Sequence, residues 1–305
     1  MASAPGHFRR SPRPVTVAAV QMACDWNSAG NIARAERLVR AAAAQGAQII
    51  LLPELFETPY FCIEQDARHL GLAHAVTDDA AVRHFAPIAR ELGVVLPISF
   101  FERAGRAYFN SIAILDADGS NLGLYRKSHI PNGPGYQEKN YFSPGDTGFK
   151  VWNTRFARIG VGICWDQWFP ETSRVMALMG AELLFFPTAI GSEPPPALPV
   201  NSREHWQRTQ QGHAAANLTP LIASNRYGLE RSLQNPQGLY IRFYGSSFIA
   251  DATGAKVAEA AEEGDAVISH TFDLEEIAQL RDNWFVFRDR RPDLYGALTS
   301  LEGKS

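Results

Sequence analysis

The chain has 305 residues, 46% of them hydrophobic and 20% charged, which is the composition of a folded globular protein and excludes a disordered one. Its 29 lysines and arginines nearly balance 32 aspartates and glutamates to give a net charge of −3, and without a long basic run we expect no nucleic-acid partner. No apolar run approaches the roughly 20 residues that a membrane-spanning helix needs, so we also expect no membrane partner. The three cysteines are widely spaced, which predicts neither a disulfide framework nor a zinc site and suits a reducing compartment such as the cytoplasm.

Predicted strands and helices alternate along the N-terminal half of the chain. Residues 1–14 are polar and rich in Pro, Ser and Arg, so we expect a disordered lead without a signal peptide. After this lead, hydrophobic patterning and helix-ending glycines predict a strand at 15–22, a helix at 31–45, a strand at 49–52, a helix at 78–92 and strands at 94–102 and 107–115. A hairpin-type turn signal at 116–119 precedes one more strand, which ends at Lys127.

The C-terminal half continues the alternation after a long loop. This loop, at 131–145, is rich in Gly, Pro and Asn, and loops of this length inside a domain are usually functional. Beyond it we predict a buried strand at 158–163, a helix at 171–178, a strand at 182–187, a helix at 202–217, strands at 220–225, 246–251 and 266–273, and a short final helix. The alternation predicts an α/β fold with helices covering the sheet faces. Because no change of composition marks a linker, we expect one domain at 15–280 and a C-terminal tail at 281–305.

Three side chains of different chemistry each stand at the end of an apolar strand. Glu54 follows one strand, Lys127 ends another, and Cys164 lies where a strand of small residues meets a helix. Together they supply a base, a cation for a developing oxyanion and a nucleophile, which is the set that thiol-based hydrolysis of a C–N bond needs. Taken singly, each has an ordinary alternative: a structural ion pair, a solvated lysine and a buried core cysteine.

With these three motifs in this order, the sequence resembles the nitrilase, or carbon–nitrogen hydrolase, superfamily, whose signature is a Glu–Lys–Cys triad. The resemblance covers residues 15–291 and implies a four-layer α-β-β-α sandwich formed by a single domain. No cluster of His, Asp and Cys has the spacing of a metal site, and no Gly-rich loop could cradle a phosphate. We therefore expect neither a metal nor a cofactor.

Each residue of the set has an expected role. Cys164 attacks the substrate to form a thioester-type intermediate, and Glu54 takes the thiol proton, passes it to the departing amine and later activates water. Lys127, with the backbone N–H of Trp165, is expected to stabilise the oxyanion. Glu138 matches a second glutamate often found near the lysine in this superfamily and is expected to orient Lys127 or to bind substrate, although an exposed loop glutamate is the common alternative.

The loops resemble the branch of the superfamily that hydrolyses N-carbamoylputrescine. This resemblance is clearest at residues 134–139, 164–171, 187–194 and 202–208. It implies a small-molecule substrate, a carbamoylated diamine, that is cleaved to putrescine, ammonia and CO₂. Glu193 is then expected to pair with the distal ammonium between aromatic walls that include Tyr60, Trp165 or Trp168. His129 either lines this pocket or is a histidine bonded to the backbone.

Two kinds of rival function stay open. A substrate with a carboxylate, such as 3-ureidopropionate, or an ω-amide would want an arginine clamp, and Arg203 and Arg208 keep this alternative alive. A catalytically silent binding module is the non-enzyme alternative, and the complete Glu–Lys–Cys set argues against it. The tail at 281–305 is rich in aromatic residues and arginines, which are typical of interfaces. Because superfamily members are generally dimers or larger, we expect a homo-oligomer with this tail at its interface.

Overall fold

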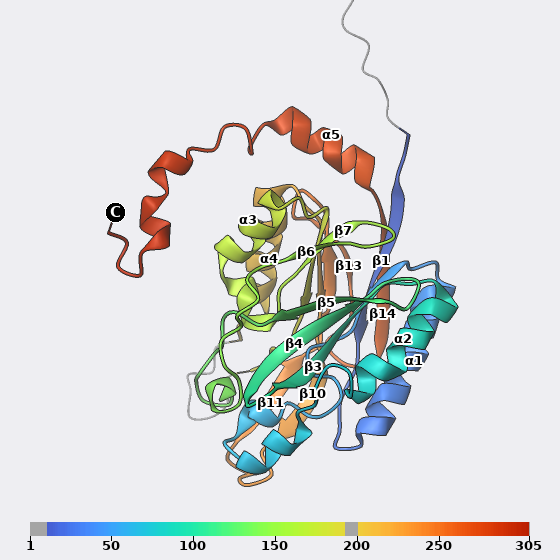
Figure 1. Ribbon diagram of the computed structural model, residues 1–305, viewed down its shortest axis with the longest axis vertical. Helices are drawn as coiled ribbons and strands as arrows, with labels where there is room; N and C mark the ends of the chain where they lie inside the picture. Colours follow the sequence, from blue (N-terminus) through green and yellow to red (C-terminus); the bar gives the residue numbers. More distant parts are fainter. Residues whose placement is uncertain (1–10, 193–200, 305) are drawn as a thin grey trace, which may run out of the picture.

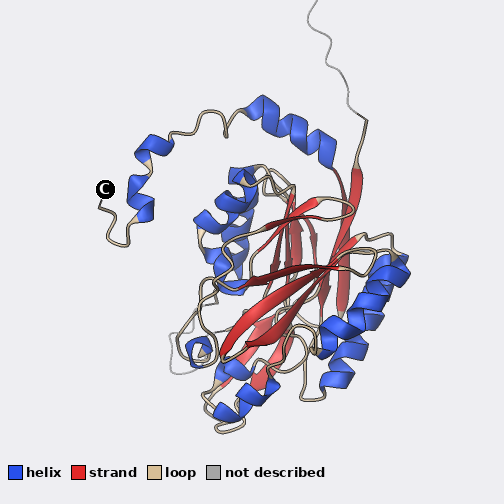
Figure 2. Ribbon diagram, in the orientation of Figure 1, coloured by secondary structure: helices blue, strands red, loops and turns tan. Residues whose placement is uncertain are grey.

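Two β-sheets lie face to face in the middle of the molecule, and a pair of helices covers the outer face of each (Figures 1 and 2). The computed structural model describes residues 11–192 and 201–304. The arrangement is a four-layer α-β-β-α sandwich, so the fold that the family resemblance implied is confirmed.

The first sheet combines strands from both ends of the chain. Its order is β14 (Ala266–Asp273), β1 (Pro14–Gln21), β2 (Ile49–Leu51), β3 (Leu96–Ala104), β4 (Ala107–Leu115) and β5 (Asn121–Arg126). A single bridge between Ile49 and Val95 joins β2 to the β3–β4–β5 group. β1 is antiparallel to β14 and parallel to β2, whereas β3, β4 and β5 form an antiparallel meander.

The second sheet holds four of the predicted strands of the C-terminal half. Its order is β13 (Lys256–Glu259), β12 (Phe248–Ala250), β9 (Leu221–Ser224), β8 (Leu183–Pro187), β7 (Arg158–Val161) and β6 (Val151–Asn153). The four predicted strands are β7, β8, β9 and β12, whereas the predicted strand at 266–273 is β14 of the first sheet. A separate antiparallel hairpin consists of β10 (Tyr227–Arg231) and β11 (Tyr240–Tyr244). Neither this hairpin nor β6 and β13 is among the predicted strands, because these segments are short and mix exposed with buried positions.

The four layers of the sandwich bury their apolar residues against one another, between the two sheets and between each sheet and its helices. α1 (Ser28–Ala44) and α2 (Ala80–Leu92) cover the first sheet, and α3 (Pro170–Leu178) and α4 (Arg203–Asn217) cover the second. On β8, Leu184 and Phe186 face the helices and pack near Met176 and Trp206, whereas Phe185 faces the first sheet. This alternation is the period of two that a strand dictates. Within the described part of the chain, no helix is both long and apolar enough to cross a membrane.

Both ends of the domain differ from their predicted boundaries. Pro14 already belongs to β1, and the backbone N–H of Arg13 donates to Asp273 at 2.9 Å; residues 1–10 of the predicted lead lie outside the described residues. At the other end, α5 (Leu274–Trp284) crosses the predicted boundary between 280 and 281. The helix continues because Arg281 donates to the carbonyl oxygen of Leu218 at 2.8 Å, which ties its last turn to the end of α4. The chain beyond α5 arches past the α3 side of the sandwich (Figure 1).

A glycine in the long loop fixes the end of β5. The N–H of Gly145 donates to the carbonyl oxygen of Lys127 at 2.8 Å, and a Cβ at Gly145 would lie 2.0 Å from the carbonyl oxygen of Arg126. We expect Gly145→Ala to lower the free energy of unfolding by about 1–3 kcal/mol, because the clashing atoms are backbone. Urea denaturation measures this change. Gly212→Ala, on an open face of α4, is the matched control and should be neutral or stabilising; equal losses for both variants would contradict the prediction.

Candidate active site

The three predicted catalytic side chains lie together at the edge of the two sheets. Glu54 follows β2 and Lys127 follows β5, both in the first sheet, whereas Cys164 begins the 3₁₀ turn η4 (Cys164–Trp168) after β7 of the second. The Nζ atom of Lys127 is 2.9 Å from Oε1 of Glu54. The Cys164 thiol is near enough to both that their charges shift its pKa. The structure thus brings together residues that are far apart in sequence.

Glu54 is fully buried, and its two carboxylate oxygens have different surroundings. Oε1 accepts hydrogen bonds from Lys127 and from the Nδ2 atom of Asn110, the latter at 2.7 Å. Oε2 has no hydrogen-bond partner among the described residues. The backbone of this turn is held by Arg226, whose guanidinium donates to the carbonyl oxygens of Glu54 at 2.7 Å and of Leu55 at 3.0 Å. Oε2 is therefore the oxygen left to accept a proton.

Lys127 is a buried cation held by two carboxylates. Its Nζ atom is 2.8 and 2.7 Å from the two oxygens of Glu138, in addition to its bond to Glu54. Burial alone would lower the pKa of Lys127, but the charges of Glu138 and Glu54 outweigh it and raise the pKa well above its ordinary value. The ammonium consequently stays charged and has a fixed orientation.

Glu138 is buried, and the alternative of an exposed loop glutamate is wrong. The short 3₁₀ turn η3 (Glu138–Asn140) places it within the long loop, and the hydroxyl of Tyr60 donates to its Oε1 at 2.7 Å. Burial raises the pKa of Glu138 to about 7, against the opposing effect of Lys127. Tyr60 packs near Tyr136 and Phe243. It is not among the described walls of the cavity, although the sequence predicted it as one of the aromatic walls.

Cys164 occupies a backbone conformation that non-glycine residues rarely adopt, with φ at +42°. Its Sγ atom is 3.9 Å from the carbonyl oxygen of Ala189. Burial and the nearby charge of Glu54 raise the pKa of the thiol well above its ordinary value, and Lys127 opposes them. The resting thiol is protonated, so it needs a base before it can attack.

Asp166 fixes the turn that carries the cysteine, and the sequence analysis missed it. Its buried carboxylate accepts from the backbone N–H of Ile163 at 2.9 Å, the hydroxyl of Tyr125 at 2.8 Å and Nδ1 of His129 at 2.7 Å. The ring of His129 thus donates to a carboxylate, and it stacks on Phe169 with ring centroids 3.7 Å apart. His129 is not among the described walls of the cavity. Asp166 links the nucleophile turn of one sheet to the end of β5 in the other.

A cavity of about 390 Å³ opens above Cys164. Its described walls come from the long loop, η4, the end of β8 and the start of α4, and they consist of Pro131, Asn132, Gly133, Pro134, Tyr136, Glu138, Cys164, Trp165, Trp168, Ala189, Ile190, Ser202 and His205. Trp165 lines this cavity as predicted, whereas Glu193 lies outside the described residues. No lysine or arginine is among these described walls, so an anionic group bound there would meet no permanent cation from them.

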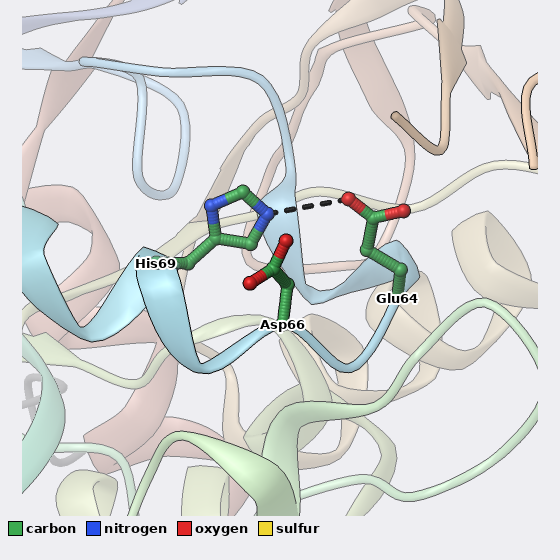
Figure 3. A group of neighbouring side chains, drawn as sticks. All are labelled: Glu64, Asp66 and His69. Atoms are coloured by element: carbon green, nitrogen blue, oxygen red, sulfur yellow. Dashed lines mark hydrogen bonds and ion pairs between the residues drawn. The ribbon is translucent and has the colours of Figure 1, made fainter. Parts of the chain in front are cut away.

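One group of side chains among the described residues has the geometry to hold a metal ion (Figure 3). Ligand atoms of Glu64, Asp66 and His69 lie within 4.8 Å of one another, and Nε2 of His69 is 3.3 Å from Glu64. The carboxylate of Asp66 is paired with Arg68, and Glu64 accepts hydrogen bonds from the side chain of Ser232 and from a backbone N–H. These bonds account for the arrangement as a tie between the 61–72 segment and the chain after β10.

Comparisons with known proteins agree with this geometry. Residues 16–282 match the sequence model of the carbon-nitrogen hydrolase family. The chain is 56% identical over 293 residues to the N-carbamoylputrescine amidase of Solanum lycopersicum, covering 96% of this chain and 97% of that protein. It is 54% identical over 282 residues to a citrullinase of Francisella tularensis, covering 92% and 96%. The crystal structure of a carbon-nitrogen hydrolase from Helicobacter pylori G27 has a TM-score of 0.88 at 36% identity and covers 94% of this chain and 99% of that one. The chain therefore belongs to the carbon–nitrogen hydrolase family.

Proposed function

We propose that this protein is an amidohydrolase that converts N-carbamoylputrescine and water to putrescine, ammonia and CO₂. The observation that carries the proposal is the buried contact of Lys127 with Glu54 and Glu138 beside Cys164, next to a cavity whose described walls include no lysine or arginine. The likeness to N-carbamoylputrescine amidases over almost the whole chain supports this substrate. The alternative of a silent binding module has no support from a site in which base, cation and thiol are all present.

The reaction follows from the Cys164 thiol, which lines the cavity, and from Glu54 and Lys127, which are buried beside it. Oε2 of Glu54 takes the proton of the Cys164 thiol, and the sulfur forms a bond to the ureido carbon while the carbonyl oxygen becomes negative. Lys127 stabilises that oxygen, and a donor of this kind typically contributes on the order of 10²–10³ in turnover. Glu54 then gives its proton to the nitrogen that leaves, so the C–N bond breaks and an acyl-enzyme forms. Water deprotonated by Glu54 releases the acyl group as a carbamic acid and regenerates the thiol, and the carbamic acid loses CO₂ to give the second amine product.

The charge of the cavity favours an ammonium over a carboxylate at the far end of the substrate. The aromatic rings of Trp165 and Trp168, which line the cavity, suit a cationic chain end through cation–π contact. Neither arginine that kept the anionic rival open lines the cavity. Arg203 pairs with Glu262 at 2.6 Å, and Arg208 pairs with a glutamate on its own helix. A carboxylated ureido substrate would therefore lack the arginine clamp that it needs.

A substrate panel tests the proposed function. Release of ammonia is measured with N-carbamoylputrescine, citrulline, 3-ureidopropionate and an ω-amide. We expect kcat/KM to be at least about tenfold higher for N-carbamoylputrescine, since one buried charge pair is worth that much or more. Cys164→Ala should abolish turnover, whereas Cys24→Ala, which removes a buried thiol elsewhere in the core, should retain it. Preference for a carboxylated substrate, or turnover by Cys164→Ala near the original rate, would contradict the proposal.

Glu193 is proposed as the partner of the distal ammonium, although it lies outside the described residues. Glu193→Gln keeps the shape of the side chain and removes its charge, so we expect KM for N-carbamoylputrescine to rise by about tenfold or more. Steady-state kinetics measures the change. Glu204→Gln is the control, because Glu204 forms an exposed pair with Arg208 on α4. An unchanged KM in Glu193→Gln would remove this assignment.

We also propose that the protein is a homo-oligomer that uses its C-terminal segment as an interface. Support comes from large apolar side chains that are exposed in this single chain, on the tail at Trp284, Leu294 and Leu298 and on α3 at Leu178. Light scattering should give at least twice the monomer mass, and deletion of residues 285–305 should reduce it. A monomer mass for the full chain would contradict the proposal. The cytoplasmic location of the protein stays a prediction.

A further inference from the structure

One side chain near Glu54 has no part in the proposed reaction steps and yet contacts the proposed base directly. Nδ2 of Asn110 donates to Oε1 of Glu54 at 2.7 Å, and both side chains are fully buried. Lys127 donates to the same oxygen at 2.9 Å. Oε1 therefore has two donors, while Oε2 has no partner among the described residues. The asymmetry of this carboxylate depends on the donor that Asn110 adds.

Asn110 interrupts an apolar row on the inner face of β4. Ile112 and Ile114, which share its face by the period of two, pack between the two sheets. The backbone at Asn110 also aligns the lysine, because the N–H of Lys127 donates to the carbonyl oxygen of Asn110 at 2.8 Å. One residue of β4 thus contacts the base through its side chain and the lysine through its backbone.

The orientation of the Asn110 amide is determined by Glu54. The Oδ1 atom of Asn110 is buried without a hydrogen-bond partner among the described residues, and an unmade hydrogen bond of this kind destabilises a folded protein. The reverse orientation would place Oδ1 against a carboxylate oxygen, so that two acceptors would face each other. An arrangement that leaves Oδ1 unsatisfied in order to donate to Glu54 indicates a role at the carboxylate rather than in packing.

We propose that Asn110 is a positioning residue that fixes the orientation of the Glu54 carboxylate and presents its Oε2 atom to the Cys164 thiol. With Asn110 in place, Oε1 is bound on two sides and the carboxylate cannot rotate without losing a hydrogen bond. Without it, only Lys127 holds the carboxylate, which can turn either oxygen toward the ammonium. The inference rests on the proposed role of Glu54 as base, and it does not depend on which ureido compound is the substrate.

Two variants of Asn110 and one neighbouring control test the proposal. Asn110→Ser shortens the side chain so that it no longer reaches Glu54, and Asn110→Asp keeps the shape but replaces the donor by an acceptor. Ser111→Ala is the control, because Ser111 is equally buried on the same strand and its hydroxyl donates to Glu102 at 2.6 Å, away from Glu54. Circular dichroism identifies any variant that does not fold; if Asn110→Ser is unfolded, the isosteric Asn110→Asp decides the test.

Steady-state kinetics with N-carbamoylputrescine gives the first readout. We expect Asn110→Ser to lower kcat by about tenfold to a hundredfold, a part of what a general base contributes, with KM changed by less than about threefold. We expect Asn110→Asp, which replaces the donor by an acceptor, to lower kcat at least as much. Ser111→Ala should change neither kcat nor KM. An unchanged kcat in the Asn110 variants, or the same change in Ser111→Ala, would overturn the proposal.

Alkylation of Cys164 by iodoacetamide, followed by mass spectrometry, gives a second readout without substrate. Sulfur replaces iodide and the thiol proton leaves by way of Glu54, so we expect Asn110→Ser to slow alkylation about tenfold. In a Glu54→Gln background the same substitution should have no further effect, as a double-mutant cycle requires for residues acting through one another. If Asn110→Ser slows alkylation in a protein that does not hydrolyse N-carbamoylputrescine, the proposed substrate is refuted and the positioning role of Asn110 is supported. If Asn110→Ser slows alkylation equally with Glu54 and in the Glu54→Gln background, the positioning role of Asn110 is refuted.

Discussion

A fully buried ammonium between two carboxylates is the interaction on which the site depends. Removing charges from water is costly, and a buried pair that loses one partner typically costs about 3–5 kcal/mol. Lys127 meets this requirement through Glu54 and Glu138, whose combined charge raises its pKa despite burial. The hydroxyl of Tyr60 and the amide of Asn110 extend the network to both carboxylates. The lysine is charged and oriented before any substrate arrives, which is what stabilisation of an oxyanion requires.

The base and the cation belong to one sheet, and the nucleophile belongs to the other. The apolar layer between the sheets therefore sets the separation between Cys164 and the charged network. Asp166 adds a polar connection across the same gap, since it accepts from Ile163 on the nucleophile side and from Tyr125 and His129 on the lysine side. A positive φ at Cys164 is sustained only when its surroundings determine it fully, and this carboxylate provides such a constraint.

The sequence was sufficient for those parts of the molecule in which one local pattern determines one element. Long apolar strands and capped helices have such patterns, and Glu54, Lys127 and Cys164 stand at strand ends where the chain leaves the sheet. The hairpin of β10 and β11 has mixed exposure and no such pattern. Asn110 is visible in the sequence as a polar residue in an otherwise apolar row. Its role, however, depends on its contact with a carboxylate 56 positions away. Contacts of that kind follow from the packed fold and not from local propensity.

The residues that select the substrate belong to a different part of the chain from the residues that catalyse the reaction. The catalytic set lies at the ends of strands, whereas the described cavity walls come mainly from the long loop, η4 and the start of α4. Overall identity is dominated by the shared core, so it is 56% to an N-carbamoylputrescine amidase and 54% to a citrullinase, proteins whose names give different substrates. The sign of a few charges in the cavity distinguishes a substrate with an ammonium from one with a carboxylate, and a difference of two per cent in overall identity does not. The described walls of this cavity offer aromatic side chains and no lysine or arginine, and that charge pattern, more than overall similarity, is the reason to favour the carbamoylated diamine.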